Sequence, residues 1–363
     1  MIKSTKIVFV ILQILIIHIT QIFAQDFKVS GYVDAYYAYD NDDNGSSLRQ
    51  FSAVAPIRDQ FRLNLAQVTG SYSADKVRGV VTLQFGDIPY YNWPQTPNQY
   101  LQHIQEANIG FQPAKNLWFD IGYFLTHIGA EGIIPINNNF STLALTTNFE
   151  PFYQSGIKLS YAFSDKVYGS LFLLNGYNVF ADNNKNLSGG MQFGVKIRKN
   201  LELVYNNILG NEQPSGSKGK TRFFNNLVVK YSPYDKLDIL FGADYAIQQE
   251  SKLTDSLSAA DLYGGLLSFR YKFAPKFSLM LRLETYQDKN GILSGTYMNN
   301  DSVFTGLESH GISFGIEHRP VENGYLRIET RYLKTPDNLR IFSSNKNPED
   351  SRTELILSGG ISF

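Results

Sequence analysis

The chain has 363 residues, 33 basic and 33 acidic side chains, and no cysteine. The missing cysteines exclude disulfides, thiolate chemistry and cysteine-bound zinc, and the zero formal net charge gives no support for nucleic-acid binding. Aromatic residues make up 14% of the chain and charged residues only 18%, a balance that favours strands over helices.

Residues 1–24 are predicted to form a secretory signal peptide. Lys3 and Lys6 precede an apolar run over 7–19, and Ile22-Phe23-Ala24 provides a cleavage site. The run is shorter than the ~20 residues of a membrane-spanning helix, so an uncleaved anchor is the less favoured alternative. We therefore expect an exported chain whose mature part, residues 25–363, can cross a membrane only with strands.

From Phe27 onward, apolar residues recur at every second position, in runs that end at turn or loop sequences. Such alternation predicts strands with one apolar and one polar face. A change of parity near Gln67 predicts a β-bulge. The predicted strands cover residues 27–37, 58–72, 77–85, 106–111, 117–125, 157–163, 167–173, 191–197, 201–205, 223–231, 237–245, 263–273, 277–283, 312–316, 326–332 and 355–363.

Short turns of about three to five residues alternate with loops of about twelve to twenty-seven residues along this series. Transmembrane barrels have an even number of antiparallel strands, short periplasmic turns and long outer loops. The last strand alternates apolar and small residues up to Phe363. Pairing this strand with the first would leave no free edge, so we predict an all-β, antiparallel up-and-down transmembrane barrel of about 16 strands.

Two loop sequences match known ligand-binding motifs only in part. Asp40, Asp42, Asn44 and Gly45 match the start of a calcium-binding loop, but its twelfth position is Phe51 rather than Glu, so a solvated surface loop is the preferred interpretation. A second loop ends in Gly219-Lys220-Thr221 without the first glycine and the helix of a phosphate-binding loop. His310 and His318 are interpreted as membrane-interface residues rather than as a metal-binding pair. We predict no metal site and no cofactor.

The interior of a barrel with ~16 strands is too wide for side chains to fill, so the apolar faces are expected to contact outer-membrane lipid. The opposite faces would then line a water-filled lumen, where charges are tolerated. A ladder of cross-strand ion pairs that stiffens the wall is an equally supported alternative. The predicted pore-lining residues are Arg62, Glu106, Asp120, Arg282, Glu284, Arg327, Glu329 and Arg331.

The segment from Gly122 to Glu131, with Asn138, Ser141 and the run Leu174-Asn175-Gly176-Tyr177, resembles the OmpL-like family of beta-barrel porins. The resemblance extends over most of the mature chain. It implies a porin-like barrel in the outer membrane of a Gram-negative bacterium. In general porins the third outer loop folds into the lumen. Here that loop is 126–152, and we predict that His127 and Glu131 lie near a constriction.

The favoured function is passive diffusion of small polar solutes. The alternative is a non-conducting barrel whose outer loops bind a partner or a surface glycan. An enzyme is not expected, because no histidine has an obvious serine partner on its own strand face. The barrel-assembly machinery is expected to recognise the strand ending at Phe363. A homotrimer is compatible with this architecture.

Overall fold

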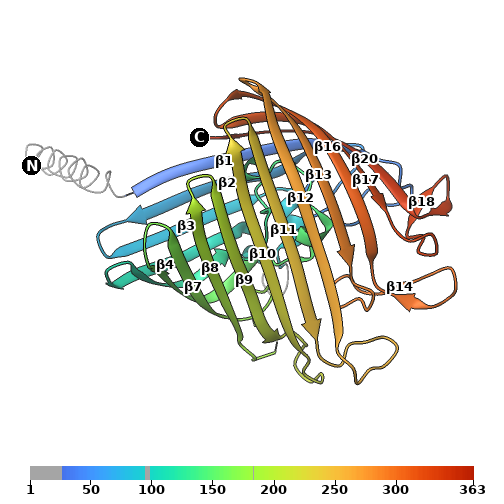
Figure 1. Cartoon of the computed structure of the whole chain (residues 1–363), viewed down its shortest axis with the longest axis horizontal. Helices are drawn as coiled ribbons and strands as arrows, with labels where there is room; N and C mark the ends of the chain where they lie inside the picture. Colours follow the sequence, from blue (N-terminus) through green and yellow to red (C-terminus); the bar gives the residue numbers. More distant parts are fainter. Residues whose placement is uncertain (1–26, 95–98, 183) are drawn as a thin grey trace, which may run out of the picture.

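A computed structural model describes residues 27–94, 99–182 and 184–363; the predicted signal peptide, 1–24, lies outside them. Sixteen antiparallel strands, each paired with its neighbours in chain order, form one closed barrel (Figure 1), which confirms the predicted fold. The barrel strands are β1 (Phe27–Asp40), β2 (Phe61–Ser73), β3 (Val77–Phe85), β4 (Ile104–Ala114), β5 (Leu117–Leu125), β6 (Tyr153–Ala162), β7 (Val167–Leu174), β8 (Ser188–Arg198), β9 (Leu201–Asn211), β10 (Thr221–Tyr234), β11 (Leu237–Gln248), β12 (Ala260–Ala274), β13 (Phe277–Gln287), β16 (Glu308–Val321), β17 (Gly324–Lys334) and β20 (Ser351–Ser362).

The connections sort by length as the sequence predicts. Short turns join β2 to β3, β4 to β5 and so on at one end of the barrel, which we call the short-turn end; long loops join the strands at the other, the loop end (Figure 1). The loops contain the helices α2 (Asp87–Asn92), η1 (Gln99–His103), η2 (Pro135–Asn137) and α3 (Leu145–Phe149), and the hairpins β14 (Tyr297–Met298) with β15 (Phe304–Thr305) and β18 (Phe342–Ser344) with β19 (Asn347–Glu349). Among the described residues, no helix is both long and apolar enough to cross a membrane.

The barrel closes between its first and last strands. β1 and β20 pair from Tyr32 opposite Ser362 to Asp40 opposite Glu354. Beyond the ladder, the Gly31 N–H donates to the Phe363 carbonyl at 2.7 Å and the Phe363 N–H donates back at 3.0 Å. The apolar final strand therefore has no unpaired edge, which is the condition for a sheet to remain in a bilayer.

The predicted bulge exists, but its predicted position near Gln67 is wrong. The register of β1 against β2 shifts between Asp34 and Ala35, which face Leu65 and Leu63, so Asn64 is the extra residue. The Asn64 amide donates to Asp34 Oδ1 at 2.7 Å and accepts from the Ala55 N–H at 3.1 Å. A polar contact inside the barrel thus fixes the bulge, and it turns Leu65 inward, where it is fully buried.

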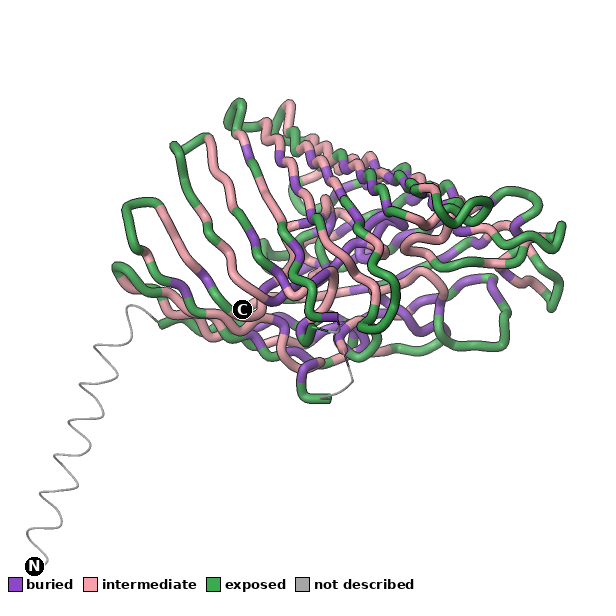
Figure 2. Tube along the Cα trace, turned by 90° about the horizontal axis from the view of Figure 1, so that it is seen from below, coloured by how far each residue is buried: buried purple, intermediate pink, exposed green. Residues whose placement is uncertain are grey.

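The outer surface of the barrel is apolar. Alternate side chains of the strands are large, hydrophobic and exposed, as the predicted lipid-facing pattern requires. Aromatic residues close to the short turns are also exposed, namely Phe111, Phe163, Tyr231 and Phe273. Buried residues gather in the middle of the barrel and toward the loop end, whereas the strand tips at the short turns are exposed or half-buried (Figure 2).

Candidate functional site

The interior toward the loop end is packed rather than water-filled. Inward side chains from distant walls, including Phe172, Phe224 and Leu333, belong to one hydrophobic cluster together with residues of the loops. The prediction that inward faces line water throughout is therefore corrected for this half. The physical reason is that loops from several sides fold into the barrel and bury apolar side chains there.

Phe51, from the loop between β1 and β2, lies where four loops meet. Its ring centroid is 6.2 Å from that of Phe149, 6.3 Å from Tyr297 and 6.3 Å from Phe342, which come from three other loops. Nearby, the buried Arg49 guanidinium donates to Asp40 Oδ2 at 2.9 Å and to the Ala55 carbonyl at 2.6 Å, and it pairs with Glu354. We call Phe51 and the three loop residues packed around it, Phe149, Tyr297 and Phe342, the outer cap.

The loop 126–152, called the third loop below, crosses the lumen beneath the outer cap. Its tip is fixed to the β17 wall by two buried side chains. Glu329 accepts the N–H groups of Ser141 and Thr142 at 2.9 and 2.8 Å. Arg327 donates to the carbonyls of Pro135 and Asn138 at 2.8 and 2.7 Å. Charged side chains thus satisfy main-chain groups of a loop that has little regular structure.

A second group of charges holds the middle of the third loop. Arg282 donates to Glu131 Oε1 at 3.0 Å and to the Thr142 carbonyl at 2.7 Å. Glu284 accepts the Leu145 N–H at 2.6 Å, and it forms a bidentate pair with Arg331 at 2.8 and 2.7 Å.

These contacts correct the expectation that the charges of β13 and β17 face water. The five side chains are 0–6% exposed; they are Arg282, Glu284, Arg327, Glu329 and Arg331. They do point into the barrel, and the ion pair between Glu284 on β13 and Arg331 on β17 agrees with the alternative of a stiffened wall. Sequence reasoning could not place them further, because four of the five also bind groups of the third loop, whose path no strand pattern specifies.

The other predicted lumen charges lie on β2, β4 and β5. The Arg62 guanidinium is partly exposed and forms a bidentate pair with Asp87 of α2, at 2.6 and 2.7 Å. Asp120 is buried between Arg78 Nε at 2.7 Å and Lys158 Nζ at 3.7 Å. Glu106 is half-buried and accepts the Leu125 N–H at 3.3 Å.

The two residues predicted near a constriction, His127 and Glu131, both lie on the third loop inside the barrel. The His127 ring stacks on Phe172 at 3.9 Å and bonds Gln154 Oε1 and the Asn207 carbonyl, each at 3.0 Å. Burial lowers the pKa of the His127 imidazole. Glu131 is buried and bound to Arg282 and to the Ala144 N–H.

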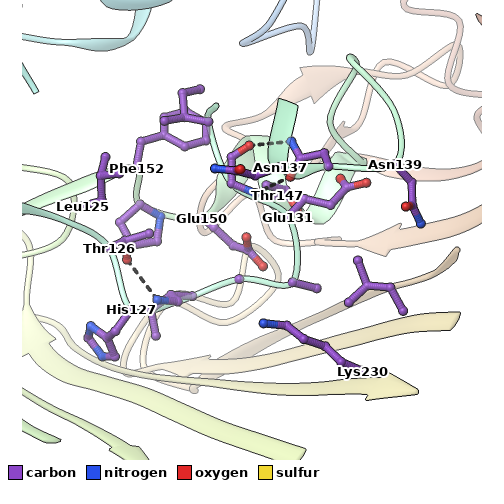
Figure 3. Close-up of a pocket in the computed structure, with 18 of the residues that line it drawn as sticks. Leu125, Thr126, His127, Glu131, Asn137, Asn139, Thr147, Glu150, Phe152 and Lys230 are labelled. Carbon is purple, nitrogen blue, oxygen red and sulfur yellow. Dashed lines mark hydrogen bonds between the residues drawn. The ribbon is translucent and has the colours of Figure 1, made fainter. Parts of the chain in front are cut away.

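A cavity of ≈ 610 Å³ with both polar and apolar lining residues separates the start and end of the third loop from the wall of β10 and β11. The Glu150 carboxyl group and the Lys230 amine point into it from opposite sides (Figure 3). A second cavity of ≈ 440 Å³ lies against β5 to β8 and is lined by Arg78 and Lys158. Thr126, His127 and Gln192 line both cavities. Both extend toward the short-turn end, where the barrel carries no long loops.

Sequence reasoning missed an acid pair beside the larger cavity. Glu150, at the end of α3, and Asp244, on β11, lie within hydrogen-bonding distance of each other, and Asp244 also accepts the Asn226 amide at 2.7 Å. Burial and then the charge of Asp244 raise the pKa of Glu150 well above its ordinary value of 4.5. Glu150 is therefore the member of the pair that holds a proton at neutral pH.

We expect rising pH to loosen the end of the third loop. A raised pKa stabilises the packed loop fully below the ordinary value of 4.5, and this stabilisation is lost as the pH rises from there through the raised pKa. Within that window, amide hydrogen exchange over 145–149 should lose protection by about ten-fold per pH unit. Glu150→Gln, which mimics the protonated acid, should remain protected at all pH values. Glu250→Gln, in the loop after β11, is the matched control; equal pH dependence in wild type and Glu150→Gln would contradict the assignment.

The closed barrel, its apolar outer surface and a long third loop folded across the interior together define a transmembrane β-barrel of the porin type. Residues 26–363 match the family model described as "Putative beta-barrel porin-2, OmpL-like", and the chain belongs to this family. This confirms the family indicated by the sequence. A search of curated proteins gives no match.

Solved structures with the same fold include three outer-membrane proteins of low sequence identity. The anion-selective porin from Comamonas acidovorans aligns with a TM-score of 0.62 at 10% identity, covering 93% of this chain and 99% of that chain. The channel DcaP of Acinetobacter baumannii gives 0.61 at 12%, covering 93% and 97%. OprB of Pseudomonas putida gives 0.61 at 11%, covering 95% and 96%.

Proposed function

We propose that this protein is a passive diffusion channel for small polar solutes in the outer membrane of a Gram-negative bacterium. The observation that carries the proposal is the pair of cavities between the third loop and the barrel wall, which contain charged side chains and share Thr126, His127 and Gln192. The Lys230 amine and the Glu150 carboxyl group in the larger cavity, with Arg78 and Lys158 in the smaller one, suit polar solutes rather than apolar ones. The family and the fold of the three porin-type structures agree with a channel.

In this proposal the predicted lumen charges act in two ways. Asp120 holds Arg78 and Lys158, which line the smaller cavity, and we propose that Arg62 and Glu106 face the same lumen. The charges of β13 and β17 hold the third loop that narrows the path. His127 and Glu131 form part of the constriction from the loop side. Because the outer cap covers the loop end, we expect a small unitary conductance with frequent closures.

The purified full-length protein, reconstituted in planar bilayers in KCl, should give discrete conductance steps. Their size should remain small, because the path runs beside the third loop rather than through an open barrel. A folded, correctly inserted protein that gives no steps at any voltage would refute the channel. Denatured protein added at the same concentration is the control for leakage.

A second candidate function is a non-conducting barrel whose loops bind a partner or a surface glycan. The packing of Phe51 against three other loops favours it, because such a cap shapes a fixed outer surface. Liposome swelling separates the two candidates. Liposomes that contain the channel should swell in an isotonic solution of a small sugar, whereas those with a closed barrel should not.

Outer-membrane lipid would surround the apolar wall. The barrel-assembly machinery would recognise the β20 strand that ends at Phe363. We also propose assembly as a homotrimer, which chemical crosslinking of intact outer membranes tests by the appearance of dimer and trimer bands.

A further inference from the structure

Three arginines converge on one carboxylate near the short-turn end. Glu317 on β16 is 1% exposed. It binds Arg327 Nε at 2.8 Å through Oε2, and Arg319 Nε at 2.8 Å and Arg270 through Oε1. One negative charge thus faces three positive charges, so this group carries a net charge of +2.

Two lysines add further positive charge to this group. Lys272 on β12 and Lys276 in the turn after it are exposed, and no carboxylate among the described residues lies within ion-pair distance of either. The remaining acids nearby are Asp238, opposite Arg270 in the ladder, Glu322 in the turn after β16, and Asp34, which interacts electrostatically with Arg327. Counting all of them, five cations face four carboxylates, which leaves +1.

These side chains enclose a cavity of ≈ 490 Å³ at the rim of the barrel, lined by Arg270, Lys272, Lys276, Ser278 and Arg319. Residues 270, 272, 278 and 319 alternate with outward-facing neighbours such as Tyr271 and Phe277, so they face the lumen. The cavity is therefore a recess inside the rim, out of reach of lipid headgroups on the outer surface. The guanidinium groups at its edge can donate paired hydrogen bonds to the oxygens of a planar carboxylate or a tetrahedral phosphate.

Arg319 links this recess to the third loop. Its Nη2 donates to the Ile136 carbonyl at 3.2 Å, while Nη1 reaches the Glu322 carbonyl at 3.4 Å and Nε holds Glu317. The same side chain thus borders the recess and supports the loop tip. A solute bound in the recess would lie next to the element that narrows the path.

We propose that the recess is a binding site for small oxyanions, either phosphates or carboxylates, at the short-turn end of the solute path. The selectivity part of this inference rests on the proposed channel function; the binding part does not. Anions are concentrated at the rim by the uncompensated charge, and the channel favours them over cations of equal size.

Binding is tested first by a measurement that does not depend on ion conduction. Isothermal titration calorimetry of sodium phosphate into the purified full-length barrel, in non-ionic detergent at low salt, should show saturable binding. The double variant Lys272→Gln/Lys276→Gln should weaken it about five-fold, since exposed charges each contribute modestly. Neither lysine forms an ion pair, so the fold should persist. Lys76→Gln/Lys115→Gln, which removes two exposed lysines from other short turns, is the matched control and should bind like wild type.

The selectivity part is tested in bilayers by the reversal potential across a KCl gradient. Wild type should favour chloride, and Lys272→Gln/Lys276→Gln should move the reversal potential toward zero. No phosphate binding by wild type, or equal loss in the control variant, overturns the site. A barrel that binds phosphate but carries no current supports the site and refutes the channel. A conducting barrel with unchanged selectivity in the lysine variant overturns the selectivity part alone.

Discussion

Replacing Arg327 by methionine is expected to release the tip of the third loop and to raise the single-channel conductance. Arg327 is fully buried and makes three strong contacts, with Glu317 and with the carbonyls of Pro135 and Asn138. Removing one partner of a buried ion pair costs about 3–5 kcal/mol, and the two carbonyls lose their donors as well. Of the charged side chains that hold the loop tip, Glu329 and Arg319 then remain.

The measurement is conductance in planar bilayers, with folding checked by the resistance of the barrel to unfolding in detergent gels. A widened path should raise the conductance by about two-fold and increase its noise. Arg340→Met, at an exposed position in the loop after β17, is the matched control and should behave like wild type. If Arg327→Met folds and conducts like wild type, either the tip is held without Arg327 or it does not limit the path.

Replacing Phe51 by alanine should open the outer cap. The ring contacts Phe149, Tyr297 and Phe342 from three loops, so one truncation removes contacts from all of them. Phenylalanine-to-alanine changes in packed interiors cost about 3–5 kcal/mol. The barrel strands do not depend on this ring, so we expect the loss to appear as loop mobility rather than unfolding.

Liposome swelling with sugars of increasing size measures this effect. Phe51→Ala should admit larger sugars than wild type and should spend more time open in bilayers. Phe304→Ala, which truncates a 58% exposed ring in the loop after β13, is the matched control and should leave the size limit unchanged. Increased hydrogen exchange in the loops without any change in swelling would show that the outer cap does not obstruct the path.

The features that sequence reasoning predicted correctly are local or periodic. The alternation in strands such as 277–283 specifies which face meets lipid, because side chains of a strand point to opposite sides at each step. The apolar last strand ending at Phe363 required a partner, and β1 is that partner. The alternation of short and long connections followed from the same pattern.

The sequence contains a pattern that indicates the packed interior. Several strands carry apolar residues on both faces, for example Phe172 between Leu171 and Leu173, and Leu266 beside Leu267. Both inward members, Phe172 and Leu266, are buried. Water does not stabilise such side chains inside a barrel, so they indicate that loops would fill that half.

The strands, their faces and the closure of the barrel follow from the amino-acid pattern alone, because a period of two and the need to satisfy every backbone group in lipid act locally. The contents of the barrel depend on how distant segments pack together. Arg327 and Glu329 bind main-chain groups of a loop about 190 residues earlier in the chain, at separations of 189–192 and 187–188 residues. The contact between the Glu150 and Asp244 side chains likewise joins residues that are far apart in the chain. No periodic pattern specifies such contacts, since they depend on where a loop without regular structure crosses the lumen.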